Sequence, residues 1–278
     1  MKVLVAKTAG FCFGVKRAID IAFQIAREKR QGVYTFGPII HNPQVVKKLA
    51  QQGIVPIDSL KAKKDIRALI IRTHGIPLGI SQEMLSRGYE IIDATCPFVK
   101  KAQYYAKLLN KEGYQVVILG EKNHPEVQSL MSYAGGDAVV VSGETPLPKL
   151  RRKIGIVVQT TQPLEALKNV LSGALELAKE IKVYNTICNS TALRLNETAK
   201  MAGKVDVMVV VGGKNSANTT QLTRLCKSLG VPTFHIETAS EMKKTWVRNA
   251  KTIGITAGAS TPAWIIADVE KRMRNRGG

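Results

Sequence analysis

The sequence predicts an α/β protein of three similar small domains with mainly parallel sheets, arranged as a pseudo-threefold trefoil around a shared centre. Three observations lead to this class. Short apolar runs alternate with segments of helical periodicity along all 278 residues. Three cysteines stand at the entrances of expected helices. Polar residues follow each of these cysteines at similar offsets, which indicates one unit used three times.

Composition places the chain among soluble globular proteins. It is 45% hydrophobic and 22% charged, and its length allows two or three small domains. Residues 1–8 contain a short apolar strand rather than a signal sequence, and no apolar run approaches the roughly 20 residues of a membrane span. We therefore expect a cytoplasmic protein with no membrane partner. Four scattered cysteines in such a compartment favour free, metal-bound or catalytic thiols over disulfides.

The first domain is expected to span residues 1–96. Residues 2–7 (KVLVAK) are typical of a strand, and apolar side chains recur at helical spacing over 14–30. Asn42 and Pro43 suit the cap and the first position of a second helix. Further strands are expected at 33–36, 54–57, 68–71 and 90–93, with a helix over 78–87.

The same order recurs in a second domain, 97–188, and a third, 189–278. Pro97 begins a helix in the second domain, and the apolar run 205–211 in the third is typical of a buried parallel strand. The other elements expected in the second domain are strands at 115–119, 138–141, 154–158 and 182–184, a loop at 144–153, and a helix over 164–180. Those expected in the third are helices over 190–203 and up to about 274, and strands at 232–235 and 251–256.

Three cysteines and the residues that follow them form the functional pattern. Cys12, Cys96 and Cys188 lie 84 and 92 residues apart, too far for a local zinc knuckle. One polar residue follows each cysteine by 28 or 29 residues: His41, His124 and Ser216. A second follows by 62, 64 and 72 residues: His74, Thr160 and Ser260. All fall at expected strand ends, where parallel sheets bind their ligands, so we expect each unit to contribute one thiolate and two polar groups to a shared centre.

Three thiolates at equivalent positions favour one soft metal centre. Zinc bound by three cysteines and a histidine is one possibility, although structural zinc sites usually include a close ligand pair. A [4Fe-4S] cluster tolerates separated ligands, and with three cysteines it would keep one iron open for substrate. Cys226 lies inside a helical pattern and is expected to be a buried hydrophobe, and His235 has no counterpart in the repeat.

The polar groups around such a centre suit a phosphorylated substrate. Imidazoles, hydroxyls, helix N-termini and glycine-rich strand ends are good partners for a phosphate or diphosphate. Glu126 is the one carboxylate of the pattern and so the one group able to deliver a proton. Together these features favour reductive removal of a leaving group from a phosphorylated substrate.

A series of longer motifs extends this pattern over nearly the whole chain. They are Ala9-Gly10-Phe11-Cys12-Phe13-Gly14-Val15, Gly37-Pro38-Ile39-Ile40-His41-Asn42, Thr73-His74-Gly75, Asp93-Ala94-Thr95-Cys96-Pro97, His124-Pro125-Glu126, Gly212-Gly213-Lys214-Asn215-Ser216 and Thr256-Ala257-Gly258-Ala259-Ser260-Thr261-Pro262. In this order they resemble the LytB-type iron–sulfur reductases of 4-hydroxy-3-methylbut-2-enyl diphosphate, which act last in the methylerythritol phosphate route to isoprenoids.

The resemblance implies a specific chemistry. One oxygen-sensitive [4Fe-4S] cluster per chain would be bound by Cys12, Cys96 and Cys188. The substrate's allylic hydroxyl would bind the fourth iron and leave as water, giving isopentenyl and dimethylallyl diphosphates. Glu126 would donate the proton through a network with Thr160 and His124. The residues implied to bind the substrate are His41, His74, His124, Thr160, Ser216, Asn218 and Ser260.

One position departs from the resemblance: Ala217 stands where the family commonly has a second serine. We expect this replacement to weaken or rearrange diphosphate contacts rather than abolish function, because neighbouring hydroxyls and backbone N–H groups remain.

The net charge of +20 leaves alternatives open. It suits an acidic electron donor such as a ferredoxin or flavodoxin by steering encounter. A zinc-stabilised binding protein and a basic RNA-binding protein are the alternatives, but aromatic residues reach only 5% and no nucleic-acid motif accompanies the charge, so nucleic acid is not the expected partner.

Overall fold

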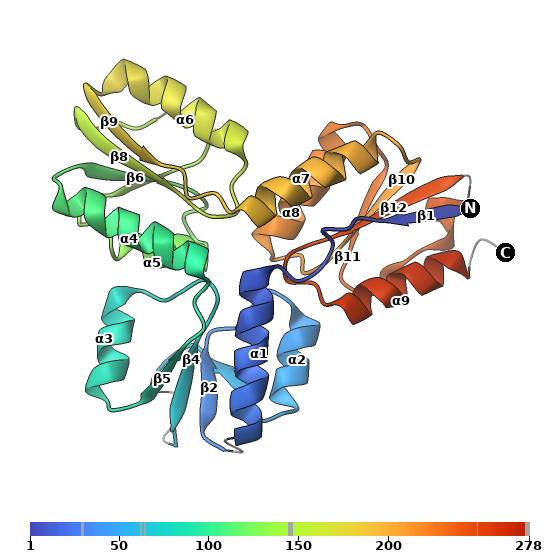
Figure 1. The fold of residues 1–278 in the computed structure, drawn as a ribbon, viewed down its shortest axis with the longest axis horizontal. Coiled ribbons are helices and arrows are strands. Elements are labelled where there is room, and N and C mark those ends of the chain that lie inside the picture. The colour runs from blue at the N-terminus through green and yellow to red at the C-terminus, as the bar shows by residue number, and fades with distance from the viewer. Residues whose placement is uncertain (29–30, 62, 64, 144–146, 249, 276–278) are drawn as a thin grey trace. The chain divides into compact units, whose positions relative to one another are not determined.

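The computed structural model describes residues 1–28, 31–61, 63, 65–143, 147–248 and 250–275. Within these ranges the chain forms three four-stranded sheets, and strands alternate with helices along the sequence (Figure 1). All neighbouring strands in these three sheets pair in parallel. The predicted class, three α/β units with parallel sheets, is confirmed.

Sheet B lies within residues 33–93. Its strands are β2 (Val33–Phe36), β3 (Val55–Ile57), β4 (Ala68–Ile71) and β5 (Glu90–Asp93), in the spatial order β3-β2-β4-β5. The helices of this part of the chain are α1 (Phe13–Glu28), α2 (Pro43–Ala50) and α3 (Leu78–Ser86). Asn42 caps α2 by accepting the Val45 N–H at 3.1 Å, as its position before Pro43 predicts.

Sheet C follows in residues 115–184. Its strands are β6 (Gln115–Leu119), β7 (Val139–Val141), β8 (Lys153–Val158) and β9 (Glu180–Tyr184), in the order β7-β6-β8-β9. The accompanying helices are α4 (Pro97–Lys111), α5 (Pro125–Met131) and α6 (Leu164–Leu177).

Sheet A joins the last part of the chain to its first strand. Its strands are β10 (Val207–Val211), β11 (Thr233–Ile236), β12 (Thr252–Ala257) and β1 (Lys2–Val5), in the order β11-β10-β12-β1. The helices here are α7 (Asn189–Ala202), α8 (Ala217–Ser228) and α9 (Ala263–Arg274), with short 3-10 helices η1 (Ala239–Glu241) and η2 (Lys244–Val247).

The three sheets share one topology. In each sheet, the strand that leads to the first polar residue of the repeat (β2, β6 or β10) lies second in space. It is flanked by the second and third strands of that sheet, and the fourth strand lies beside the third. In sheet A this fourth place belongs to β1, whose residues 2–5 pair with Thr252–Ile255 of β12. The N-terminal strand therefore completes the sheet of the last domain, whereas the expected boundary 1–96 groups it with sheet B. The division into 1–96, 97–188 and 189–278 remains a prediction.

The chain divides into two compact parts, which are called the first unit and the second unit below. The first contains Met1–Lys16, Ile40–Lys47 and Asn189–Gly278 and includes sheet A. The second contains Arg17–Ile39 and Lys48–Cys188 and includes sheets B and C. Each unit thus holds part of the predicted site.

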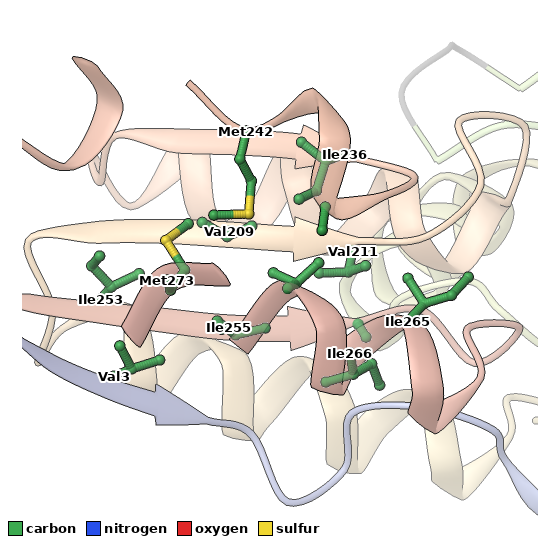
Figure 2. Packing of buried hydrophobic residues seen from close by; sticks show 13 residues of the cluster. Val3, Val209, Val211, Ile236, Met242, Ile253, Ile255, Ile265, Ile266 and Met273 are labelled. Atoms are coloured by element: carbon green, nitrogen blue, oxygen red, sulfur yellow. The ribbon is translucent and has the colours of Figure 1, made fainter. Parts of the chain in front are cut away.

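The core of the first unit lies between sheet A and the helix and short 3-10 segment that cover one of its faces (Figure 2). Val209, Val211, Ile253 and Ile255 point from the two central strands toward this core, where Met273 of α9 packs against them. A central strand of a parallel sheet is apolar on both faces, because helices cover each side of the sheet. The run 205–211 predicts a buried strand; the strand begins at Val207, and all of Val207–Val211 is buried, whereas Asp206 is exposed.

Helix α6 is shorter than expected. The periodicity predicts a helix over 164–180, but it ends at Leu177, and Ala178 is extended, with φ −107° and ψ 149°. Residues 180–184 pair instead with β8, beginning with Glu180 opposite Lys153. Pairing along five residues of an otherwise open sheet edge outweighs another turn of helix.

Some expectations fall on residues outside the described part of the chain. They are residues 29–30 of the helix expected over 14–30, residues 144–146 of the expected loop, and the last residues, 276–278. No helix in the described part of the chain is long and apolar enough to cross a membrane.

Ile255 provides a test of the core of the first unit. It is fully buried in the central strand β12, so Ile255→Ala removes apolar contacts and leaves a cavity. We expect a loss of about 2–5 kcal/mol in the free energy of unfolding, measured by urea titration. Leu193→Ala, at a side chain that is 61% exposed, serves as the control and should change it by less than about 0.5 kcal/mol. Equal effects of the two substitutions would contradict this packing.

Candidate active site

The predicted site residues follow the carboxyl ends of equivalent strands. Fourth strands β1, β5 and β9 lead to Cys12, Cys96 and Cys188, each directly before a helix. Third strands lead to His74, Thr160 and Ser260, and first strands lead to His41, His124 and Ser216. The regular offsets in the sequence thus have a structural origin, because each offset runs from the end of the fourth strand of one sheet to the end of the first or third strand of the next sheet along the chain.

Glu126, at the start of α5 in the second unit, is the only buried carboxylate among the described residues, with 1% exposure. Its Oε1 accepts the Thr160 N–H at 2.6 Å, and its Oε2 accepts the Thr160 hydroxyl at 2.9 Å. Desolvation raises the pKa of Glu126 to about 7, against the opposing effect of these two hydrogen bonds. A carboxyl whose pKa is raised toward neutral pH is suited to act as an acid catalyst.

His124 caps the helix that carries Glu126. Its Nδ1 accepts the Glu126 N–H at 3.1 Å, so in the neutral ring the proton is assigned to Nε2. The ring of His74 meets that of His124 edge to face, with centroids 5.3 Å apart and an interplanar angle of 85°. The second unit therefore brings together His74, His124, Glu126 and Thr160.

Backbone hydrogen bonds fix the cysteines in the same way in all three repeats. The N–H of Cys96 donates to the carbonyl of Thr73 at 2.9 Å, and that of Cys188 donates to Thr160 at 2.9 Å. In the first unit the Cys12 N–H donates to Ala259 at 3.2 Å. Each acceptor lies in the loop after the third strand of the same sheet. It is either a predicted site residue, Thr160, or the residue directly before one, as Thr73 precedes His74 and Ala259 precedes Ser260.

These three cysteines are suited to bind a metal. All are partly exposed, and each lies directly before the first residue of a helix. None of the four cysteines forms a disulfide. Cys226 differs: it is fully buried in an apolar cluster, and burial raises its pKa to about 11, which confirms that it is a buried hydrophobe.

The first unit groups the remaining polar residues around the loops after β10 and β12. Ser216 caps α8 by accepting the Thr219 N–H, and its hydroxyl lies 3.5 Å from that of Ser260. Ser260 also donates to the carbonyl of His41 at 3.3 Å. Asn218 uses its Oδ1 to accept the Ala259 N–H at 2.9 Å, which turns its amide nitrogen away from this loop. Ser216, Asn218 and Ser260 are all buried.

Gly213 allows the loop of His41 to lie close against the loop that follows β10. An added Cβ at Gly213 would lie 2.4 Å from the carbonyl oxygen of His41, closer than real contacts allow. The glycine-rich segment 212–213 is therefore required for the close packing of these loops, as its position at a strand end suggests.

Sequence reasoning missed several buried polar residues that support the site. Gln159 is fully buried, accepts the Glu121 N–H at 2.9 Å and donates to Thr161 at 3.0 Å, so it joins the loops of Glu126 and Thr160. The Thr186 hydroxyl accepts the Val158 N–H at 2.9 Å and thereby extends the sheet toward Cys188. His235, to which we assigned no role, contacts the carbonyl of Gly212 through Nε2 at 2.9 Å.

Comparison with known proteins yields one family. The sequence model of the LytB protein family matches residues 3–274. A protein of Citrifermentans bemidjiense named 4-hydroxy-3-methylbut-2-enyl diphosphate reductase is 48% identical over 98% of this chain and 97% of its own length. A protein of the same name from Pelobacter propionicus is 50% identical over 98% of each chain.

Two solved structures are similar over almost the whole chain. One is described as (E)-4-hydroxy-3-methyl-but-2-enyl diphosphate reductase, the terminal enzyme of the non-mevalonate pathway; it is 44% identical, with a TM-score of 0.71, over 99% of this chain and 100% of that one. The other, an E-1-hydroxy-2-methyl-but-2-enyl-4-diphosphate reductase from Plasmodium falciparum, is 27% identical, with a TM-score of 0.90, over 99% and 87%. The resemblance and the fold class predicted from the sequence are confirmed.

The buried carboxyl makes stability depend on pH. Its pKa is about 7 in the folded chain against an ordinary value of 4.5, so the folded state binds more protons between these values. The stabilisation is complete below pH 4.5 and is lost as the pH rises through 7. Relative to Glu126→Gln, the wild type should lose up to about 3 kcal/mol of unfolding free energy between pH 4 and pH 8, measured by urea titration. The exposed Glu121→Gln is the control; a constant difference between wild type and Glu126→Gln would contradict the shifted pKa.

Proposed function

The chain belongs to the LytB family, and we propose that it reduces 4-hydroxy-3-methylbut-2-enyl diphosphate, the compound that names its relatives. One observation carries the proposal beyond the family: Glu126 is a buried acid with a pKa of about 7, hydrogen-bonded to Thr160, whose carbonyl in turn holds the amide of Cys188. A proton donor is thus tied to a predicted metal ligand through a single residue.

The proposed reaction is a reductive dehydroxylation of the E isomer. The C–O bond of the allylic hydroxyl breaks, and two electrons and two protons convert the substrate into one water molecule and a diphosphate without the hydroxyl. The two allylic positions at which hydrogen can be added give isopentenyl and dimethylallyl diphosphates.

We propose that Cys12, Cys96 and Cys188 hold the redox centre. Their partial exposure, their helix N-termini and their equivalent backbone hydrogen bonds fit three thiolate ligands of one centre. When bound, a [4Fe-4S] cluster with these three ligands would supply the electrons and offer one open iron to the substrate oxygen. Helix dipoles at the three loops would help to offset the negative charge of the thiolates.

Glu126 would supply a proton through Thr160. The hydrogen bond between Oε2 and the Thr160 hydroxyl is 2.9 Å long, so a protonated Glu126 can donate to Thr160 Oγ1 while that hydroxyl donates its own proton onward. The Thr160 N–H stays bound to Oε1 and keeps the carboxyl oriented during this exchange. His124, which fixes the Glu126 backbone, would present its Nε2–H to the substrate.

The diphosphate would be held by hydroxyl, amide and imidazole side chains of the predicted site. Ser216 lies at the N-terminus of α8, where backbone N–H groups favour an anion, and Ser260 lies beside it. Because Asn218 Oδ1 is engaged by Ala259, its amide N–H groups are the ones that would face the anion. His41 and His74 would complete this set. Ala217, the first residue of α8, offers no hydroxyl, so we expect weaker diphosphate contacts there than in relatives with serine.

The electron donor follows from charge. With 41 basic against 21 acidic residues, the chain would attract an acidic redox protein, and we propose a ferredoxin or flavodoxin in this role.

Turnover of Glu126→Gln tests the proton donor. An amide keeps the shape of the carboxyl but has no proton to give, so we expect kcat to fall by about 10²–10⁴-fold while KM changes little. The measurement is anaerobic turnover of the diphosphate with a chemical reductant, together with iron content to show that the cluster is retained. Glu121→Gln, at an exposed carboxylate in the same loop, should keep full activity. Near-normal kcat in Glu126→Gln would show that the proton comes from elsewhere.

Metal analysis tests the redox centre. Protein purified without oxygen should contain about four iron atoms and four acid-labile sulfides per chain. Cys12→Ser, Cys96→Ser and Cys188→Ser should each lose most of this content, whereas Cys226→Ser, at the buried apolar cysteine, should retain it. Zinc without sulfide, or full iron content in any of the first three variants, would reject the proposed ligands.

A further inference from the structure

Helix α7, which begins one residue after Cys188, buries an arginine against two backbone loops of the first unit. Arg194 is 2% exposed and is among the largest fully buried side chains. Its Nη2 donates to the carbonyl of Gly10 at 3.0 Å, and its Nη1 donates to that of Ala257 at 2.7 Å. Gly10 lies two residues before Cys12, and Ala257 ends β12 three residues before Ser260. One guanidinium therefore joins the loop of a predicted cluster ligand to that of a predicted diphosphate ligand.

The backbone at Gly10 adopts a conformation that favours glycine. Its φ is +106°, which L side chains rarely adopt, and an added Cβ would lie 3.3 Å from Ile266 Cδ1 and 3.4 Å from the carbonyl oxygen of Thr261. The backbone thus turns sharply at Gly10 to present its carbonyl. The bond to Arg194 is charge-assisted and buried, which makes it stronger than an ordinary backbone hydrogen bond.

Glu197 holds the other end of the same loop from the same helix. Its Oε1 accepts the Lys7 N–H at 2.7 Å. Its Oε2 accepts the Thr8 N–H at 2.8 Å and the Thr8 hydroxyl at 2.6 Å. Desolvation acts to raise the pKa of Glu197, but the hydrogen bonds from Thr8 and Lys7 outweigh it, and the pKa is lowered. The carboxylate is therefore charged at neutral pH and holds residues 7–8, while Arg194 holds residue 10.

We propose that Arg194 and Glu197 are positioning residues that fix the Cys12 thiol for cluster binding, and that Arg194 also fixes the Ser260 loop. This inference rests on the proposed function for its purpose. Neither side chain needs to touch substrate, because both act on the backbone of residues 7–10. The helix that follows one cluster ligand thereby sets the position of another.

The physical consequence of losing this clamp is local. Removing the guanidinium leaves the carbonyls of Gly10 and Ala257 without a charge-assisted donor in a buried place. The loop before Cys12 then exchanges among several conformations, and the thiol becomes reachable more often. The packing of α9 against sheet A is untouched, so the rest of the unit stays closed.

Thiol reactivity of the full chain tests the clamp. We compare wild type, Arg194→Met and Arg224→Met, a control at an exposed arginine of α8, after removal of iron by a chelator. Iodoacetamide is the probe, and peptide mass spectrometry gives the alkylation rate at each cysteine. In Arg194→Met we expect roughly a tenfold faster reaction at Cys12, the effect of one charge-assisted hydrogen bond on loop opening. Rates at Cys96 and Cys188 should stay within twofold, and Cys226 should stay protected.

Two results would overturn the proposal. One is a Cys12 rate equal to that of wild type. The other is a parallel rise at Cys12 and at Cys226, since Cys226 is fully buried in the same unit and reports its general opening. If Arg194→Met does not fold, Glu197→Gln takes its place. The amide of glutamine has only one acceptor oxygen and no charge, so it holds residues 7–8 less firmly, and Cys12 should react several-fold faster. An unchanged rate again rejects the clamp.

This readout is separate from the proposed function. It needs neither cluster nor substrate, so a protein that contains zinc and no sulfide would reject the function and leave the clamp to be judged on thiol rates alone. Conversely, iron-loaded active enzyme with unchanged Cys12 reactivity in Arg194→Met would reject only the clamp.

Discussion

The structure depends on one repeated backbone hydrogen bond. In each repeat the N–H of a cysteine donates to a carbonyl in the loop after the third strand of the same sheet: Cys12 to Ala259, Cys96 to Thr73 and Cys188 to Thr160. This bond is possible because the third and fourth strands are parallel neighbours, so their carboxyl ends lie together. The order of strands thus determines which loops meet, and the meeting of loops determines which side chains can share a site.

A buried acid is the costly part of this arrangement. Glu126 is buried, and its two hydrogen bonds from Thr160 offset only part of the cost of desolvating the ionised carboxylate. Ionisation of this buried carboxyl near neutral pH therefore lowers the stability of the fold, and the proposed role as proton donor would account for its position. The surrounding support is dense: Gln159 joins the two loops, and His124 caps the helix.

The sequence was sufficient to predict the fold class, because the class depends on periodic features. The cysteines and the polar residues at matched offsets from them were selected from the same periodicity, and their roles stay predictions. Alternating apolar runs mark parallel strands, and the offsets between Cys12, His41 and His74 recur wherever the same strand ends recur. Three features escaped prediction. Strand β1 completes the sheet of the last domain, which no local pattern shows. The end of α6 is decided by pairing of β9 with β8. In the sequence, nothing distinguishes Arg194 from the other basic residues on helices, although its buried side chain donates to two backbone carbonyls.

The central claim is that this chain removes the hydroxyl of a C5 allylic diphosphate with electrons from a metal centre. The most direct measurement is mass spectrometry of the diphosphates after anaerobic incubation of the reduced, iron-loaded full chain with (E)-4-hydroxy-3-methylbut-2-enyl diphosphate. The account predicts that substrate is replaced by isomeric diphosphates that lack its hydroxyl oxygen, at a rate that falls as the pH rises above about 7 and Glu126 loses its proton. Recovery of unchanged substrate from protein that carries equal amounts of iron and sulfide would contradict it.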